Sequence, residues 1–365
     1  MKFRCERDVL VEALNTAGRA VSTRGGSLPV LSGVRLELSD DTLQTTGSDL
    51  DLTITSSVTV DGQSDGVAVL PSKLATEIAR ALEPGAVNVE ISGDEASIDA
   101  GRSRFAVRTI PAAEFPRVAK PAGDGVTLDA KVLAEALRQV VAAASADESR
   151  PILTGVLMAA EAEGLRLVAT DSYRLAVRDL PGTSFLAEGQ NVLVPSSALK
   201  ELNRVLNHAD EVTLRLGDRD AAFELGGVSL ITRLIEGEFP NYRTLIPDVQ
   251  PNRMTVSREG LLDAVRRVRV VANDPSTPVR LAMSADGLEL TATAQDVGNS
   301  FEQLDAKYEG NELTVAFNPE YLIAGIEAST GDEVTLETVD ALKPALLRSI
   351  DNSDFLYLLM PVRVS

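Results

Sequence analysis

The sequence predicts an α+β protein of three repeated domains, each an antiparallel sheet backed by two helices. Helix and strand patterns recur three times in the same order, at an interval of about 120–129 residues. Consecutive strand patterns are joined by short turns, which is typical of antiparallel rather than parallel sheets. The 365 residues, 44% of them hydrophobic, are enough for compact domains of ordinary size.

An amphipathic helix opens each third of the chain. Apolar residues recur at the three-and-four spacing of one buried helical face over residues 9–17, 133–144 and 261–268. The residue types and positions predict three N-caps, namely Asp8, Asp129 and Ser257.

A strand led by a proline follows each opening helix, and a turn leads it into another strand. The first strands begin near Pro29, Pro151 and Pro278, and the second ones near Thr42, Leu165 and Leu288. Apolar and charged residues alternate from 34 to 38, as a half-buried strand requires.

A second helix is predicted after each of Pro71, Pro195 and Pro319, which lie 124 residues apart. Each third closes on a large apolar residue followed by proline, at Phe115–Pro116, Phe239–Pro240 and Met360–Pro361. These landmarks predict domains at 1–122, 123–250 and 251–365.

The composition excludes several classes of enzyme and membrane protein. One cysteine, Cys5, excludes an internal disulfide and multi-cysteine zinc sites, and one histidine, His208, excludes two-histidine metal motifs. The apolar stretches are far shorter than a membrane-spanning helix, and residues 1–10 have no continuous apolar region. We therefore expect a cytoplasmic protein that needs no cofactor or metal and does not bind membranes.

The net charge of −19 argues against a protein that grips nucleic acid tightly. The predicted helices are nevertheless more basic than the chain as a whole, whereas acidic residues concentrate in turns and strands. The cations on or beside the helices include Arg24, Lys73, Arg80, Arg138, Lys200 and Arg204. This asymmetry predicts one basic, helix-lined side and an acidic remainder.

Several segments resemble the bacterial sliding clamps, the beta subunits of DNA polymerase III. They are MKF at the start, RSRFAVRTIPAAEFP at 102–116, ATDSYRLAV at 169–177, EGEFPNYRTLIP at 236–247, AFNPEYL at 316–322 and LLMPVR at 358–363. The resemblance runs the length of the chain, and the threefold repeat agrees with it.

The resemblance implies three DNA-clamp domains per chain and a homodimeric ring of six, with the helices inside and the sheets outside. Such a ring encircles duplex DNA without reading its sequence, tethers the replicative polymerase and has no catalytic activity. A domain of about 120 residues is about 35 Å across, so six in a ring leave a hole of about 35 Å. A DNA duplex about 20 Å wide passes through such a hole.

The resemblance also implies three groups of site residues. A groove for short peptides of the polymerase, the clamp loader and other polymerases and repair proteins would comprise Leu153, Thr170, Ser172, Tyr173, Arg174, Leu175, Pro240, Leu245, Asn318, Tyr321, Pro344, Leu346, Met360, Pro361, Val362 and Arg363. The six cations named above would face DNA. The head-to-tail dimer interface would include Phe105, Val107, Val270 and Val271.

Two other interpretations remain open. One is an enzyme with a carboxylate site, formed by Asp171 with Arg174 or by Asp49 with Asp51; a structural turn explains the repeated aspartates more simply. The other is a scaffold protein that shares the repeat fold but does not bind DNA.

Overall fold

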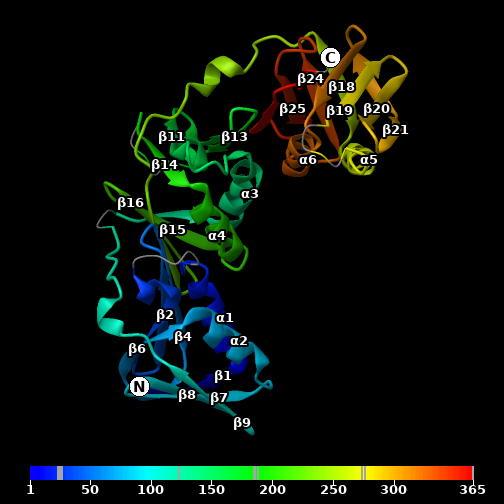
Figure 1. Ribbon diagram of the computed structural model, residues 1–365. Helices are drawn as coiled ribbons and strands as arrows, with labels where there is room; N and C mark the ends of the chain where they lie inside the picture. The colour runs from blue at the N-terminus through cyan, green and yellow to red at the C-terminus, as the bar shows by residue number, and fades with distance from the viewer. Residues whose placement is uncertain are drawn as a thin grey trace. The chain divides into compact units, whose positions relative to one another are not determined.

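The computed structural model describes residues 1–22, 28–121, 124–183, 186, 189–272, 274 and 277–363. Within them, each third of the chain contains two α-helices, as predicted (Figure 1). The helices are α1 (Arg7–Gly18), α2 (Ser72–Ala81), α3 (Ala130–Val140), α4 (Ser196–Leu206), α5 (Arg258–Val268) and α6 (Pro319–Ala328).

The chain forms two compact units. The first comprises Met1–Leu133 with Lys200–Leu234, and the second comprises Ala134–Leu199 with Ile235–Ser365. The division passes through α3 and α4, so the middle third of the sequence contributes to both units.

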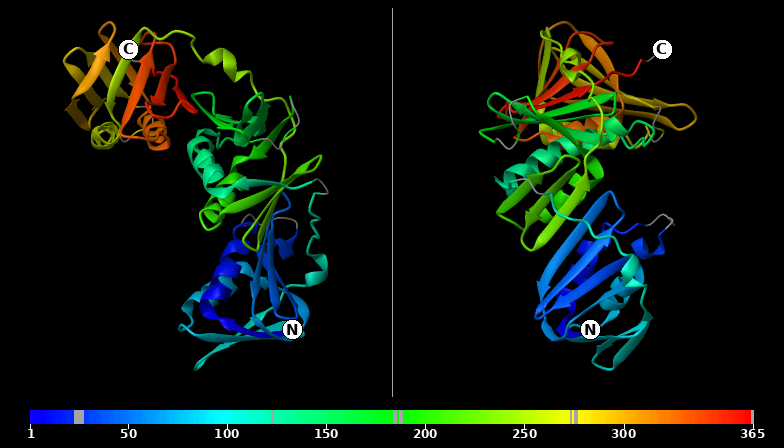
Figure 2. Two further views of the ribbon diagram at one scale, coloured as in Figure 1. Left: turned by 180° about the vertical axis from the view of Figure 1, so that it is seen from behind. Right: turned by 90° about the vertical axis from the view of Figure 1, so that its left-hand side faces the viewer.

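The first unit contains two antiparallel sheets. The five-stranded sheet has the order β5 (Asp61–Ser64), β1 (Lys2–Glu6), β7 (Ala86–Ser92), β8 (Glu95–Ala100) and β9 (Ser103–Arg108). The eight-stranded sheet has the order β10 (Val126–Asp129), β15 (Glu211–Leu216), β16 (Asp220–Leu225), β17 (Val228–Arg233), β4 (Leu52–Thr59), β3 (Thr42–Ser48), β2 (Gly33–Ser39) and β6 (Gly66–Pro71). Figure 2 shows α1 lying along the face of β3 and β4.

The second unit likewise contains two antiparallel sheets. The nine-stranded sheet has the order β14 (Asn191–Pro195), β11 (Gly155–Glu161), β12 (Gly164–Thr170), β13 (Arg174–Pro181), β26 (Phe355–Leu359), β25 (Ala345–Ser349), β24 (Glu333–Thr338), β18 (Asn252–Ser257) and β22 (Ala306–Glu309). The four-stranded sheet has the order β21 (Gly298–Leu304), β20 (Gly287–Ala294), β19 (Val279–Ser284) and β23 (Leu313–Phe317).

Alternating apolar residues place the core between the helices and the sheets. In the first unit Phe3, Leu14 and Leu36 are among the buried residues of one apolar cluster. In the second unit Phe317, Phe355 and Tyr357 are the largest fully buried side chains. Burying a side chain of this size contributes about 1.5–3 kcal/mol to the free energy of folding. Burial of these side chains is therefore the main source of stability in each unit.

Two local predictions are wrong. Pro29 and Pro151 do not begin strands, because each opens a short 3-10 turn, Pro29–Ser32 and Pro151–Thr154, and the strand starts at the following glycine. Asp8 is not an N-cap, because α1 already begins at Arg7, whose N–H donates to the carbonyl of Gly85.

The other two caps are confirmed. The Asp129 carboxylate accepts the N–H of Val132 at 2.9 Å, and the Ser257 hydroxyl accepts the N–H of Gly260 at 3.3 Å.

Candidate functional site

The strongest local constraint in the predicted peptide region is a tight turn between β12 and β13. The Asp171 carboxylate accepts the N–H groups of Tyr173 at 2.9 Å and Arg174 at 3.0 Å. Ser172 between them has a φ of +82°, a left-handed conformation that the turn imposes on a side chain other than glycine. This turn fixes where Tyr173 and Arg174 leave the sheet.

Arg174 is held by contacts on three sides. Its Nε donates to Asp171 at 2.9 Å, its Nη1 lies 3.5 Å from the Tyr357 hydroxyl, and its guanidinium carbon lies 4.4 Å from the centre of the Tyr321 ring. Burial raises the pKa of Tyr357 to about 12, so this phenol is neutral at physiological pH. The Tyr173 ring stacks on Tyr321 at 6.4 Å between centroids, which leaves an aromatic pair beside a cation.

The sheet brings the C-terminal segment to the same place. Leu175 of β13 pairs with Leu358 of β26, and Leu358 pairs with Leu346 of β25. The N–H of Met360 donates to the Tyr173 carbonyl at 2.8 Å, and that of Val362 donates to the Ala316 carbonyl at 2.8 Å. Met360 therefore lies half-buried over a floor of buried leucines.

Solvent reaches only some of the predicted peptide residues. Tyr173 is 58% exposed and Leu245 is 44% exposed, Pro240 is exposed, and Tyr321 and Met360 are half-buried. We call these five residues the partner surface. Pro361, Val362, Pro344 and Leu153 are half-buried, and Ser172 and Arg363 are exposed.

Other members of the predicted set have structural roles. Leu175 and Leu346 are 0% exposed, so they support the partner surface from beneath rather than line it. The Thr170 hydroxyl donates to the Arg174 carbonyl at 2.7 Å within the turn. The Asn318 side-chain oxygen caps α6 by accepting the N–H groups of Glu320 and Tyr321.

Sequence reasoning missed the support that Tyr357 gives to Arg174, and it preferred a structural turn as the role of Asp171 without predicting that Asp171 orients Arg174. Tyr357 follows the apolar alternation of β26 and looks like ordinary core. Its pairing with Arg174 joins residues 183 positions apart, which no local pattern shows.

The predicted DNA-facing cations lie in the helical part of the structure, apart from Arg24, which lies outside the described residues. Lys73 and Arg80 are on α2, and Lys200 and Arg204 are on α4; all four are exposed. Arg80 donates to Asn15 at 2.5 Å, and Arg204 donates to Glu201 at 3.2 Å.

Arg138 has a different environment from the other cations. It pairs with Glu135 and also donates to the carbonyls of Glu327 at 2.6 Å and Ala328 at 3.2 Å, at the end of α6. These contacts make it a helix-capping residue, with its positive charge placed where the α6 dipole is negative.

The predicted dimer residues lie on one edge strand and just after α5. β9 is an edge of its sheet, where Phe105 is 36% exposed and Val107 is buried in its own core. Val270, just beyond α5, is 77% exposed, and Val271 is half-buried. The four-stranded sheet ends at β21, where Phe301 is 61% exposed. Val107 therefore supports its strand from the core, while Phe105 and Val270 offer free apolar surface.

The enzyme interpretation finds no support in these aspartates. The Asp49 carboxylate accepts the N–H groups of Asp51 and Leu52, just as Asp171 does in the equivalent turn. Cys5 is buried, and burial raises the pKa of its thiol to about 11. The described residues contain no cluster of three or more His, Cys, Asp or Glu side chains that could hold a metal ion.

Comparisons with known proteins cover the whole chain. Family models match the N-terminal, central and C-terminal domains of the DNA polymerase III beta subunit at residues 1–119, 127–241 and 243–363. The beta sliding clamps of Streptomyces coelicolor and of a Synechocystis species are each 34% identical, over all of both chains.

Solved structures agree with the sequence comparison. The sliding clamp of Bacillus subtilis has a TM-score of 0.92 at 29% identity, and the beta subunit of Thermotoga maritima has a TM-score of 0.91 at 26% identity. Both alignments cover 100% of each chain.

Three α+β repeats, paired helices and continuous antiparallel sheets define a protein of the clamp class. The chain belongs to the DNA polymerase III beta subunit family, the beta sliding clamps. Its function is therefore that of a processivity factor for DNA polymerase III, a subunit without catalytic activity of its own.

Proposed function

We propose that two copies of this chain close head to tail into a ring that encircles duplex DNA in the cytoplasm. Membership of the clamp family and six helices in three repeats support this assembly. No helix in the described ranges is long and apolar enough to cross a membrane.

Ring closure would join the edge strand β9 of one copy to the edge strand β21 of the other. Among the described strands, each of these two pairs on one edge only, and unpaired N–H and C=O groups are a template for pairing with another chain. Phe105 on β9 and Phe301 on β21 are exposed aromatic rings that such pairing would bury. Val270 would add to the same apolar contact.

DNA would pass along the helices, attracted by Lys73, Arg80, Lys200 and Arg204. Contacts of lysine and arginine with phosphates carry no sequence information, so they permit sliding. Arg138 contributes less in this proposal, because carbonyls and Glu135 already occupy its guanidinium.

The partner surface would bind short extended peptides of the replicative polymerase, the clamp loader and other polymerases and repair proteins. Two observations carry this proposal. A half-buried methionine packs over a floor of buried leucines, and two stacked tyrosines lie beside an oriented arginine. An apolar anchor of the peptide can bury against the methionine and the rings, while Arg174 and nearby backbone groups fix its register.

Fluorescence anisotropy with a labelled peptide that has a glutamine, a leucine and a final apolar pair tests this surface. Met360→Ala should weaken binding about tenfold, because one buried apolar side chain contributes about 1.5 kcal/mol or more. Val297→Ala, at a valine that is 70% exposed between β20 and β21 of the four-stranded sheet, is the control and should bind as the unchanged protein does. Equal affinities for Met360→Ala and the unchanged protein would remove this surface from the proposal.

A scaffold that shares the fold but does not bind DNA is the alternative. A ring should stay on closed circular DNA and leave when the circle is cut, whereas a scaffold should behave identically on both.

A further inference from the structure

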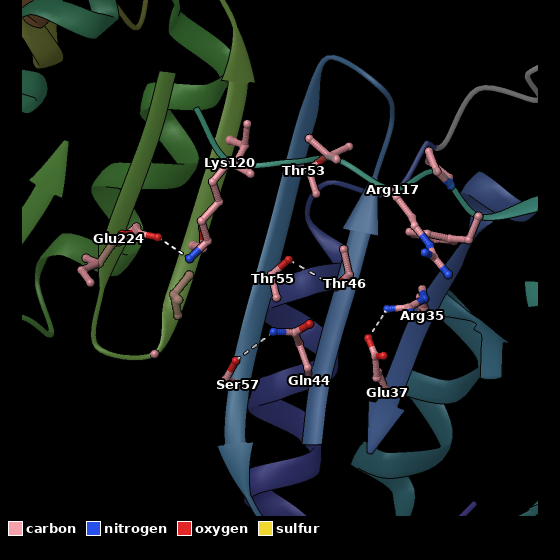
Figure 3. A pocket seen from close by; sticks show the side chains of 18 of the residues that line it. Arg35, Glu37, Gln44, Thr46, Thr53, Thr55, Ser57, Arg117, Lys120 and Glu224 are labelled. Carbon is pink, nitrogen blue, oxygen red and sulfur yellow. Dashed lines mark hydrogen bonds and ion pairs between the residues drawn. The ribbon is translucent and has the colours of Figure 1, made fainter. Parts of the chain in front are cut away.

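A polar pocket of about 810 Å³ lies on the eight-stranded sheet of the first unit, beneath the segment 115–120 (Figure 3). All of its lining residues belong to that unit. It shares no residue with the partner surface, with the cations proposed to face DNA or with the edges proposed to close the ring.

The strand register builds the floor of this pocket. Adjacent strands pair so that one row of side chains crosses the sheet, in the order Arg35, Thr46, Thr55, Ser229, Glu224. At about 4.8 Å per strand, the row is about 19 Å long. The neighbouring row contributes Glu37, Gln44 and Ser57. The middle of the floor is therefore a line of hydroxyl and amide groups, with Arg35 at one end and the Glu224 carboxylate at the other.

The segment above the floor is fixed at both ends. Phe115 is buried in an apolar cluster with Val30, Leu31 and Val69. Lys120 forms an ion pair with Glu224. Because both ends are anchored, the gap between the segment and the sheet exists before any ligand arrives.

The charges in the pocket are not balanced. The lining residues include three cations, Arg35, Arg117 and Lys120, but only two carboxylates, Glu37 and Glu224. Arg35 donates to Glu37 at 2.7 Å, whereas Arg117 has no carboxylate partner within the described part of the chain. Figure 3 shows the Arg117 guanidinium directed toward Arg35. Two guanidinium groups that lie close to one another can accommodate an anion between them.

One polar group of the floor is also unsatisfied. The Ser229 hydroxyl is buried and has no hydrogen-bond partner among the described residues. A buried hydroxyl without a hydrogen-bond partner destabilises the folded chain, and a ligand that bonds to it would remove that cost.

We propose that this pocket binds a hydrophilic ligand through an oxyanion group, phosphate or carboxylate, held between Arg35 and Arg117. The rest of the ligand would lie along the hydroxyl row. The polar floor disfavours an apolar ligand, and on a chain with a net charge of −19 a local excess of cations selects for anions.

Isothermal titration calorimetry at low ionic strength tests the site with two probes, inorganic pyrophosphate and citrate. We expect saturable binding of at least one probe with a Kd below about 1 mM. The tighter probe identifies the oxyanion as phosphate or carboxylate. No saturable binding of either probe would overturn the proposal.

Three variants of the full chain locate the binding. Arg117→Gln should weaken it about tenfold, because it removes charge-assisted hydrogen bonds. Glu37→Gln should tighten it, since it frees Arg35 from a competing carboxylate; a protein damaged in folding would not gain affinity.

Arg4→Gln removes another exposed arginine, one outside the pocket, and should leave the Kd unchanged. If Arg4→Gln and Arg117→Gln lower the affinity for the probe equally, the attraction is diffuse and the proposed site is wrong. Weaker binding of the probe by Glu37→Gln would also contradict the site.

Discussion

Asp171 is the residue that organises the partner surface. Its carboxylate accepts two backbone N–H groups and the Nε of Arg174, and it is only 7% exposed. Arg174 is in turn in contact with Tyr321 and Tyr357. A single buried carboxylate therefore sets both the turn and the direction of the arginine.

We expect Asp171→Ala to lower both thermal stability and peptide affinity, because it leaves buried donors unsatisfied at a cost of about 1–3 kcal/mol. Asp49→Ala removes the equivalent turn carboxylate in the first unit and should leave peptide affinity unchanged. Melting temperature and peptide anisotropy measure the two effects. Peptide affinity that falls equally in both variants would count against a specific role of Asp171.

Cys5 should react with alkylating reagents only after unfolding. Burial raises the pKa of its thiol from 9.0 to about 11, so the reactive thiolate is scarce in the folded chain. Because the folded pKa is the higher one, the free energy of unfolding should fall as pH rises from about 9 toward 11. Mass spectrometry after iodoacetamide treatment at pH 8, with and without urea, measures the labelling; rapid labelling of the native protein would contradict it.

At the scale of elements, the helices differ in how closely they approach their sheets. A Cβ atom added at Gly325 of α6 would lie 2.5 Å from the ring of the buried Tyr357. A Cβ at Gly260 of α5 would meet nothing closer than 3.4 Å. The glycine in α6 thus permits close packing, whereas the glycine in α5 has no such role.

The same substitution should therefore have opposite effects in the two helices. Gly325→Ala should lower the urea midpoint, because displacing a packed ring costs about 1–3 kcal/mol. Gly260→Ala should leave the midpoint unchanged or raise it, since alanine favours a helix by up to about 1 kcal/mol. A midpoint for Gly325→Ala at or above that of the unchanged protein would contradict the packing argument.

The exposed Val270, just beyond α5, makes the proposed dimer testable without unfolding the chain. Val270→Asp changes a side chain that is 77% exposed, so the folded chain should persist while the ring opens, because an unpaired charge is costly to bury. Val249→Asp, at a valine that is 74% exposed, is the matched control. Light scattering should give the mass of one 38.8 kDa chain for the first variant and of two for the second. A dimeric Val270→Asp protein would exclude this contact.

At the scale of the whole molecule, the attraction for DNA depends more on where the cations lie than on the net charge. The chain carries −19, yet exposed lysines and arginines lie on α2 and α4. The attraction for DNA should consequently be weak and strongly dependent on salt.

Lys73→Gln and Lys200→Gln should each lower the slope of log affinity against log salt by about 1, without any base preference. Lys307→Gln, an exposed lysine on β22, should leave the slope unchanged. Anisotropy with two duplexes of different sequence measures this. A clear preference between the duplexes would contradict sliding.

The sequence by itself determined the repeat, the six helices and the antiparallel strands. Local patterns suffice for these because a buried face repeats every three to four residues in a helix and every two in a strand. The residue identities at 169–177 and 358–363 also predicted a peptide site through family resemblance, and that site stays a prediction.

Only the tertiary structure decided how the thirds are joined. Strand β17 of the middle third pairs with β4, and β13 pairs with β26, so each large sheet combines strands from two thirds. The same pairing buries Leu175 and Leu346, places Tyr357 against Arg174 and aligns the row from Arg35 to Glu224. These contacts depend on which strand edges meet, and pairing between strands far apart in sequence leaves no periodic signal within either strand.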